Sequence, residues 1–176
     1  MASILPETDS RENQLNTHID KFLSNFQFGK ILRFSNFRKE KGYSCLNVFK
    51  ILFLLVFTGK NLYQYLQSEK TEDHPEKDVF YRFLNSCSYN WRKFLLLLST
   101  NIIKEKIAPL TDPDRVNVLI LDDSLFSRAR SKSVELLARV HDHVAHKYVF
   151  GFRMLTLGWS DGNTFLPLAF SLLSSE

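Results

Sequence analysis

Two adjacent carboxylates follow an apolar run in the second half of the chain. Val116–Leu121 is mostly apolar and β-branched, which predicts a buried strand, and Asp122, Asp123 and Ser124 come directly after it. A carboxylate at the end of a buried strand is costly unless it is hydrogen-bonded, ion-paired or bound to a metal ion. Carboxylate oxygens are ligands that Mg2+ prefers, and two such ions can promote phosphoryl transfer. The alternative is structural, because Asp-Asp-Ser after a strand also forms simple turns and helix caps.

Adjacent side chains on a strand point to opposite faces, so Asp122 and Asp123 should not chelate one ion together. One of them would face the site, and the residues alone leave open which one. Arg128, Arg130 and Lys132 follow shortly afterwards. Cations near a metal-binding carboxylate would suit a phosphate backbone, and a solvated basic loop is the alternative.

Other chemistries have less support in the sequence. His141, His143 and His146 suggest zinc, but His141 and His143 fall two apart on an expected helix and would point in different directions. No cysteine lies near them. Ser124 lacks the Gly-x-Ser-x-Gly context of a nucleophilic serine. We therefore predict neither a histidine metal site nor a serine nucleophile.

Helical spacing dominates the first part of the chain. After a loose polar tail at residues 1–16, apolar residues recur at helical intervals through residues 17–110. Ser44 should cap the strongest helix, which Gly59 should end, and Asp78 is a candidate N-cap. The helices are expected near residues 17–28, 30–40, 44–58, 62–66, 77–84 and 89–107. The last two could form a helix-turn-helix DNA module, although any small helical bundle would fit as well.

The periodicity changes after Pro109 and Pro113. The sequence predicts a strand, a helix in which Glu135 lies on the solvated face, a long alternating strand, a turn containing Asp161, and a returning strand. The expected ranges are 116–121, 133–144, 147–159, 160–163 and 164–173. The fold class is therefore α+β, with a helical domain at residues 17–110 and a strand-rich domain at residues 111–176.

Composition and charge fit a globular protein with a basic first part. The 176 residues are 44% hydrophobic and 24% charged, and 16 phenylalanines predict an aromatic core. Residues 1–110 hold 16 Lys/Arg and 11 Asp/Glu, whereas residues 111–176 hold 7 and 8. A basic module beside an acidic one suits a protein that holds a polyanion with one part and a metal ion with the other.

Neither a secretory signal nor a membrane span is evident. The N-terminus is polar, and the apolar stretch Ile51–Phe57 is far shorter than the roughly 20 residues that cross a bilayer. Cys45 and Cys87 lie far apart beside apolar runs and are expected to be buried free thiols. These features predict a cytoplasmic protein with no membrane association.

Three segments of the second half strongly resemble bacterial insertion-sequence transposases with a DDE catalytic domain. The strand with Asp122-Asp123-Ser124 and the hairpin Trp159–Gly162 are together fairly specific for that family. The resemblance covers about residues 115–175, with a plausible continuation into the helices. The segments are Leu119–Val144, Tyr148–Gly162 and Phe165–Ser171.

This resemblance implies a ribonuclease H-like fold, a mixed sheet whose first three strands form an antiparallel meander. It implies that Asp123, the residue directly before Ser124, is the first catalytic aspartate and a ligand of Mg2+ or Mn2+, with Asp122 as the alternative. Beside a metal-binding Asp123, the cations Arg128, Arg130 and Lys132 are the candidate DNA contacts. The family's second Asp and its Glu lie on a later strand and a later helix.

The sequence departs from the family because it stops at Glu176, directly after the third strand. Asp142 and Asp161 lie before the place where the second aspartate is expected. We therefore expect an incomplete ribonuclease H-like domain in a fragment, a truncated product or a split reading frame.

The resemblance implies that the intact protein cleaves double-stranded DNA at insertion-sequence terminal repeats and transfers strands, and a homodimer is the assembly considered for it. The present chain is expected to be inactive alone. One alternative is a non-catalytic, DNA-binding regulatory form, and another is a poorly folding relic whose third strand is an open apolar edge.

Overall fold

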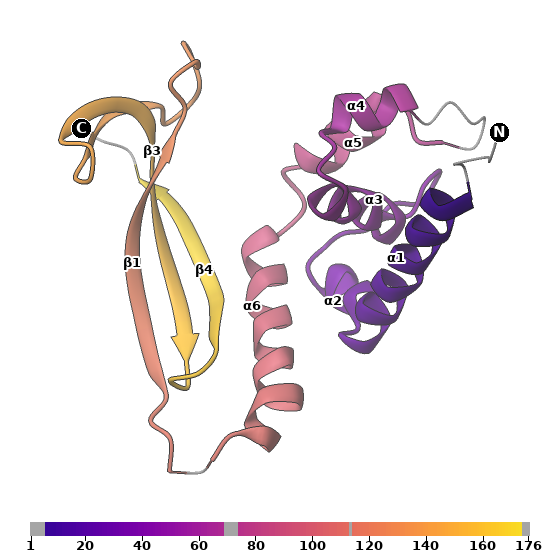
Figure 1. Cartoon of the computed structure of the whole chain (residues 1–176), viewed down its shortest axis with the longest axis horizontal. Helices are drawn as coiled ribbons and strands as arrows, with labels where there is room; N and C mark the ends of the chain where they lie inside the picture. The colour runs from indigo at the N-terminus through magenta and orange to yellow at the C-terminus, as the bar shows by residue number, and fades with distance from the viewer. Residues whose placement is uncertain (1–5, 69–73, 113, 174–176) are drawn as a thin grey trace. The chain divides into compact units, whose positions relative to one another are not determined.

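The computed structural model describes residues 6–68, 74–112 and 114–173. In these residues, α-helices come first and one four-stranded antiparallel sheet follows, which confirms the α+β class (Figure 1). The chain divides into two compact units, which we call the helical unit (residues 1–94) and the sheet unit (residues 95–176). The elements are α1 (Pro6–Asn25), α2 (Phe28–Phe34), α3 (Cys45–Thr58), α4 (Leu62–Ser68), α5 (Lys77–Leu84), α6 (Trp91–Ile102), the π-turn η1 (Ile103–Ile107), the 3-10 turn η2 (Ala108–Leu110), β1 (Val118–Ser127), β2 (Ala138–Asp142), β3 (Lys147–Ser160) and β4 (Phe165–Leu173).

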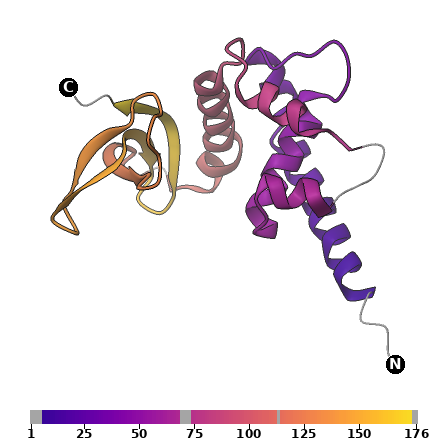
Figure 2. The same ribbon diagram turned by 90° about the horizontal axis from the view of Figure 1, so that it is seen from above.

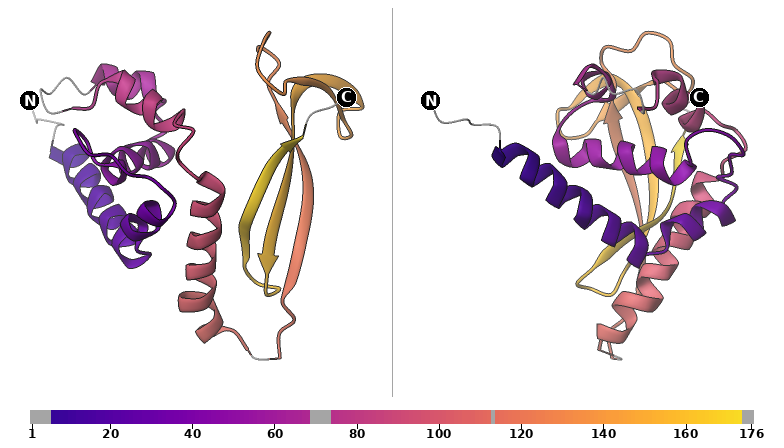
Figure 3. Two further views of the ribbon diagram at one scale, coloured as in Figure 1. Left: turned by 180° about the vertical axis from the view of Figure 1, so that it is seen from behind. Right: turned by 90° about the vertical axis from the view of Figure 1, so that its right-hand side faces the viewer.

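Aromatic rings fill the core of the helical unit, as the 16 phenylalanines predicted. Helices α1, α2 and α3 lie against one another (Figure 3), and the Phe28 ring contacts those of Phe22 and Phe49 at 5.5 Å. The Phe37 ring lies in a second cluster and stacks on Tyr89 at 4.5 Å. Phe80 on α5 is fully buried. Tilted and edge-to-face ring pairs of this kind are favourable beyond the area that they bury.

The ends of α3 are as predicted. The Ser44 hydroxyl accepts a hydrogen bond from the Asn47 N–H at 3.1 Å, and Gly59 ends the helix with a φ of 65°. Asp78 is not the N-cap of α5; Glu76 occupies that position and Asp78 lies in the first turn, where its charge still suits the helix dipole.

Three helix boundaries were predicted wrongly. Residues 6–16 belong to α1 rather than to a loose tail, and residues 1–5 lie outside the described residues. The break before α2 falls at Gln27, whose φ is 55°, and not at Gly29. Helix α2 ends at Phe34 and not near residue 40. The first error arose because residues 6–16 are mostly polar and show no apolar period from which a helix could be predicted.

The three long strands form the antiparallel meander that the family resemblance implied (Figure 1). Strand β3 is central. Strand β1 pairs along one side of it, from Val118 opposite Ser160 to Ser127 opposite Gly151. Strand β4 pairs along the other side of β3, with β3 residues Arg153 to Ser160. These same β3 residues pair with β1 on the first side.

Short strand β2 replaces part of the expected helix at residues 133–144. It pairs with the first residues of β3, on the side that β4 occupies further along. Leu136 has a φ of 61° in the turn before β2, which interrupts a helix at that point, and Glu135 lies in the same turn. Val140, opposite Val149, is buried in the sheet. The helical spacing of the apolar residues was therefore misleading.

Gly151 sits where β1, β2 and β3 meet, opposite both Ser127 and Ala138. A Cβ at this position would lie 2.6 Å from the carbonyl oxygen of Phe126, so only glycine permits this approach of the two backbones. The sheet is strongly curved when it is seen from above (Figure 2).

Strand β1 is not buried, contrary to the prediction from its apolar sequence. Leu119 and Leu121 on one face are 67% and 65% exposed, and Val118 and Ile120 on the other face are also exposed. In the described residues β1 pairs with β3 alone, so it is an edge strand. An apolar run indicates a strand, but it does not say which faces are covered.

The hairpin between β3 and β4 is the turn that was predicted, and Asp161 holds it. The Asp161 carboxylate accepts hydrogen bonds from the backbone N–H groups of Asn163 at 3.0 Å and Thr164 at 2.7 Å, and from the Thr111 hydroxyl at 2.9 Å. Buried Ser99 on α6 donates to the Pro167 carbonyl at 2.6 Å. The hydrogen bonds from Thr111 to Asp161 and from Ser99 to Pro167 tie the sheet to the segment that precedes it.

Both cysteines are free thiols; Cys45 is buried as expected, whereas Cys87 is exposed. In the described ranges, no helix combines the length and the apolar character that crossing a membrane requires.

Candidate metal-binding and catalytic site

Asp123 lies in the middle of β1, opposite Leu155, and forms an ion pair with the guanidinium of Arg153. Arg153 lies on β3 opposite Leu125, so the two charged side chains are diagonal neighbours on one face of the sheet. The hydrogen bond from Arg153 is the main cause that lowers the pKa of Asp123, and desolvation acts against it. The carboxylate of Asp123 is therefore ionised at neutral pH, and its side chain is 38% exposed.

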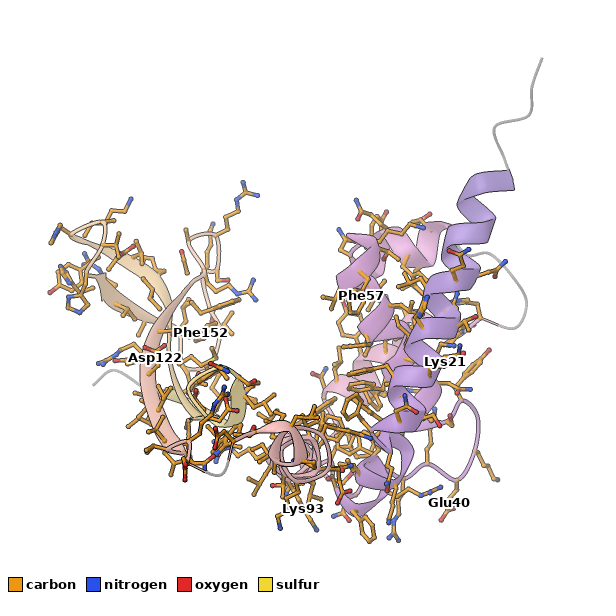
Figure 4. The ribbon with its side chains drawn as sticks, turned by 60° about the horizontal axis from the view of Figure 1, so that its bottom comes forward. Lys21, Glu40, Phe57, Lys93, Asp122 and Phe152 are labelled. Atoms are coloured by element: carbon orange, nitrogen blue, oxygen red, sulfur yellow. The ribbon has the colours of Figure 1, made fainter. Side chains whose placement is uncertain are left out.

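Asp122 points to the opposite face, as strand geometry predicted. Its partner on that face is Ser124, whose hydroxyl donates to the Asp122 Oδ2 at 2.6 Å. Asp122 is labelled on β1 in Figure 4. The two carboxylates thus differ in environment: Asp122 has a neutral partner two residues along its own strand, and Asp123 has a cation from the neighbouring strand.

The aspartates were expected at the end of the strand, but β1 continues past them to Ser127. The predicted cations Arg128, Arg130 and Lys132 therefore begin one strand segment further on. Arg128 is five residues beyond Asp123, about 16 Å along an extended strand. All three cations are exposed, and the Arg128 guanidinium lies over the Phe126 ring at 4.7 Å. They do not surround Asp123.

A hard divalent cation would find one suitable ligand at Asp123, an ionised and accessible carboxylate oxygen. Within residues 6–68, 74–112 and 114–173, no group of three or more His, Cys, Asp or Glu side chains is arranged to hold a metal ion. Asp123 therefore fits as a single member of an oxygen-ligand set.

The three histidines considered for zinc lie at the end of β2 and in the following turn. The Nδ1 atoms of His141 and His143 are 3.4 Å apart, and the His141 ring meets Tyr148 edge-on at 5.1 Å. The two ring centroids are 4.8 Å apart, where β2 ends and the turn begins, and no helix forms at these residues. His146 has a φ of 48° in the turn.

Arg153 is the site residue that sequence reasoning missed. It is the one charged residue in the alternating run from Tyr148 to Trp159, which is a signal that could have drawn attention to it. The register that places it beside Asp123 could not be read from the sequence, because it depends on the long connection between β1 and β3.

Comparison with known proteins gives one positive finding. The family model described as DDE superfamily endonuclease matches residues 45–176, which covers α3 to α6 as well as the sheet. A search of the curated proteins and a search of the solved structures each found no match. The match includes most of the chain and the strand that carries Asp123, so this protein belongs to the DDE superfamily of endonucleases.

Proposed function

We propose that this chain supplies the first carboxylate of a transposase active site, in a protein that cleaves double-stranded DNA at insertion-sequence ends and transfers the strands. The observation that supports this proposal is the ionised, accessible carboxylate of Asp123 in the middle of β1. Membership of the DDE endonucleases implies a nuclease, with DNA as the substrate.

Asp123 is the ligand that we propose, with Asp122 as the alternative. DDE endonucleases generally use divalent metal ions, and here the ion would be Mg2+ or Mn2+. When bound, such an ion supplies charge stabilisation at the phosphate and a reactive oxygen nucleophile. Asp123 contributes one oxygen ligand. Arg153 keeps the carboxylate ionised and bonds one of its two oxygens, Oδ2.

We propose that Arg128, Arg130 and Lys132, which follow the last residue of β1, contact the DNA backbone. All three are exposed, and cations at this distance from Asp123 suit phosphates beyond the reacting one. Terminal repeats as the target and a homodimer as the active form of the intact protein belong to the same proposal. So do a helical DNA-binding domain at residues 17–110 and a catalytic domain from residue 111.

The chain alone is proposed to be inactive, since its described residues hold no group of three metal-binding side chains and Asp123 would be a single ligand there. Nicking of supercoiled plasmid in Mg2+, in Mn2+ and in EDTA tests this directly. The purified chain should give the same background of nicked plasmid in all three conditions. Cleavage that needs metal and is lost in Asp123→Ala would overturn the proposed inactivity while supporting the assigned site. Metal-dependent cleavage that survives Asp123→Ala but is lost in Asp122→Ala would move the site to Asp122.

A second candidate function is regulatory binding to DNA without catalysis. It is supported by the helical unit, which holds nearly all the buried apolar side chains of the described residues. Binding of the full chain to DNA in EDTA, unchanged by Asp123→Asn, would favour this function. Absence of binding at low salt would remove it.

A further inference from the structure

A loop between α2 and α3 is held in place by aromatic packing and carries exposed cations. The Phe37 side chain is buried against rings of α5 and α6, including Phe83 at 5.8 Å. The Ser35 carbonyl accepts the Asn90 N–H at 3.0 Å, and the Tyr89 hydroxyl donates to the Arg38 carbonyl at 3.5 Å. The loop backbone is thus fixed on both sides of Phe37, and Arg38 and Lys39 project from a defined position.

Two adjacent concavities lie along this loop, with volumes of about 400 Å³ and 120 Å³. They share Lys39 and Cys45. The larger is lined by Arg33, Arg38 and Lys39, and the smaller by Lys39 and Arg82. We call the pair the basic groove. Among the described residues that line it there is no Asp or Glu.

These four cations are available to an outside anion. All are exposed, and within the described part of the chain none of them forms a salt bridge. The Arg82 Nε donates to the Asp78 carbonyl at 3.2 Å, which orients the guanidinium without neutralising it. Glu40, labelled in Figure 4, belongs to the same loop but does not line the groove.

The start of α3 adds a further positive element. Ser44, Cys45 and Leu46, the N-cap and first residues of this 14-residue helix, line the larger concavity. Free N–H groups and the helix dipole favour an anion at such a position. Guanidinium groups, an ammonium group and a helix N-terminus together match phosphate oxygens.

We propose that the basic groove binds the phosphate backbone of double-stranded DNA. The inference rests on the proposed function for its choice of DNA as the polyanion. Arginine and lysine side chains and helix N-termini supply many of the phosphate contacts in protein–DNA complexes, and the described lining of the groove holds four such cations and the start of α3. The basic groove belongs to the helical unit, whereas the cations at residues 128–132, which the sequence suggested, belong to the sheet unit.

The test is the salt dependence of binding to a short fluorescein-labelled duplex DNA of arbitrary sequence, measured by anisotropy with the full chain in EDTA. The four phosphate contacts of the groove should contribute about −3.6 to the slope of log K against log salt. The double variant Arg38→Gln/Lys39→Gln should reduce that slope by about 2, because each lost contact removes about 1. If the salt-dependent part of binding vanishes near 1 M salt, this change in slope lowers the affinity about a hundredfold at 0.1 M salt.

The matched control is Lys104→Gln/Lys106→Gln, which removes the same charge from exposed residues of η1 outside the groove. It should leave the slope nearly unchanged, and Glu40→Gln should raise affinity about twofold, since it removes a negative charge beside the groove. Equal losses in the two double variants would overturn the proposal. The proposal would also be overturned if Arg38→Gln/Lys39→Gln lost more affinity for duplex RNA than for duplex DNA. The binding is measured without metal, so failure of the Asp123 assignment would leave this result unaffected.

Discussion

The two units bury their apolar side chains to very different extents. Of the apolar side chains that are buried in the described residues, all except Val140 belong to the helical unit. In the sheet unit, Leu119, Leu121 and Phe165 are more than half exposed. The sheet is held by its backbone ladder and by polar anchors such as Asp161. The helical unit therefore depends on packing, and the sheet unit depends on backbone geometry and hydrogen bonds.

The largest predicted effect is in the helical core. Phe80→Ala should lower the free energy of unfolding by about 3–5 kcal/mol, because it empties a fully buried site. Phe57→Ala, at a residue that is 56% exposed, is the matched control and should cost far less. Thermal melting by far-UV circular dichroism compares the two. Similar losses would contradict the claim that packing holds this unit together.

Gly151 should be the most sensitive backbone position of the sheet. Gly151→Ala places a methyl group against the Phe126 carbonyl and should cost about 1–3 kcal/mol, as overpacking does. Gly29→Ala is the control, since its Cβ would meet only the Leu46 side chain at 3.4 Å. Fluorescence of Trp159, measured in a Trp91→Phe background, reports on the sheet. A stable, unchanged sheet in Gly151→Ala would show that the strands do not approach as described.

Asp161 should make the sheet sensitive to acid. The Thr164 N–H, and then the Asn163 N–H and the Thr111 hydroxyl, lower its pKa against the opposing effect of desolvation. A carboxyl whose folded pKa lies below its unfolded value of about 3.9 stabilises above that pH, and the stabilisation is lost as pH falls through the folded pKa. Asp161→Asn should therefore lower Tm at pH 7, and the difference from the parent should shrink below about pH 4.

The Trp159 melt at the two pH values checks this expectation. Thr164→Ser retains the backbone N–H that bonds Asp161 and serves as the control. A Tm difference for Asp161→Asn that stays constant from pH 7 to pH 3 would show that ionisation of Asp161 does not stabilise the hairpin.

The smallest effect is predicted for the exposed face of β1. Leu121→Thr should change the free energy of unfolding by less than about 0.5 kcal/mol, because Leu121 is 65% exposed and threonine suits a strand. A loss as large as that in Phe80→Ala would mean that β1 is covered in solution, and the contrast between the units would then fail.

Local patterns predicted much of the fold. The Ser44 cap, the Gly59 helix end, the alternating strand at residues 147–159 and the Asp161 turn each follow from a few neighbouring residues. The predicted helix at residues 133–144 was wrong because β2 exists only by pairing with β3, which periodicity does not reveal. Burial of β1 was wrong for a similar reason, since coverage is a tertiary property.

The candidate site was predicted in part. Strand geometry predicted that Asp122 and Asp123 face opposite sides of the sheet, and the choice of Asp123 as the ligand, which the family resemblance implied, stays a prediction. The ion pair with Arg153 and the basic groove were not predicted, because both join residues whose proximity depends on register or on loop packing. The predicted cations at residues 128–132 remain a proposal for DNA contact.

The most direct test of the central claim is to locate a divalent ion on the chain. Mn2+ broadens the NMR signals of nuclei near its binding site, so it can be added in small amounts to the isotope-labelled 176-residue chain. We predict broadening centred on Asp123 and Arg153, retained in Asp122→Asn and lost in Asp123→Asn. Broadening that is centred elsewhere, or that survives Asp123→Asn, would contradict the assignment of Asp123 as the metal ligand of this DDE endonuclease.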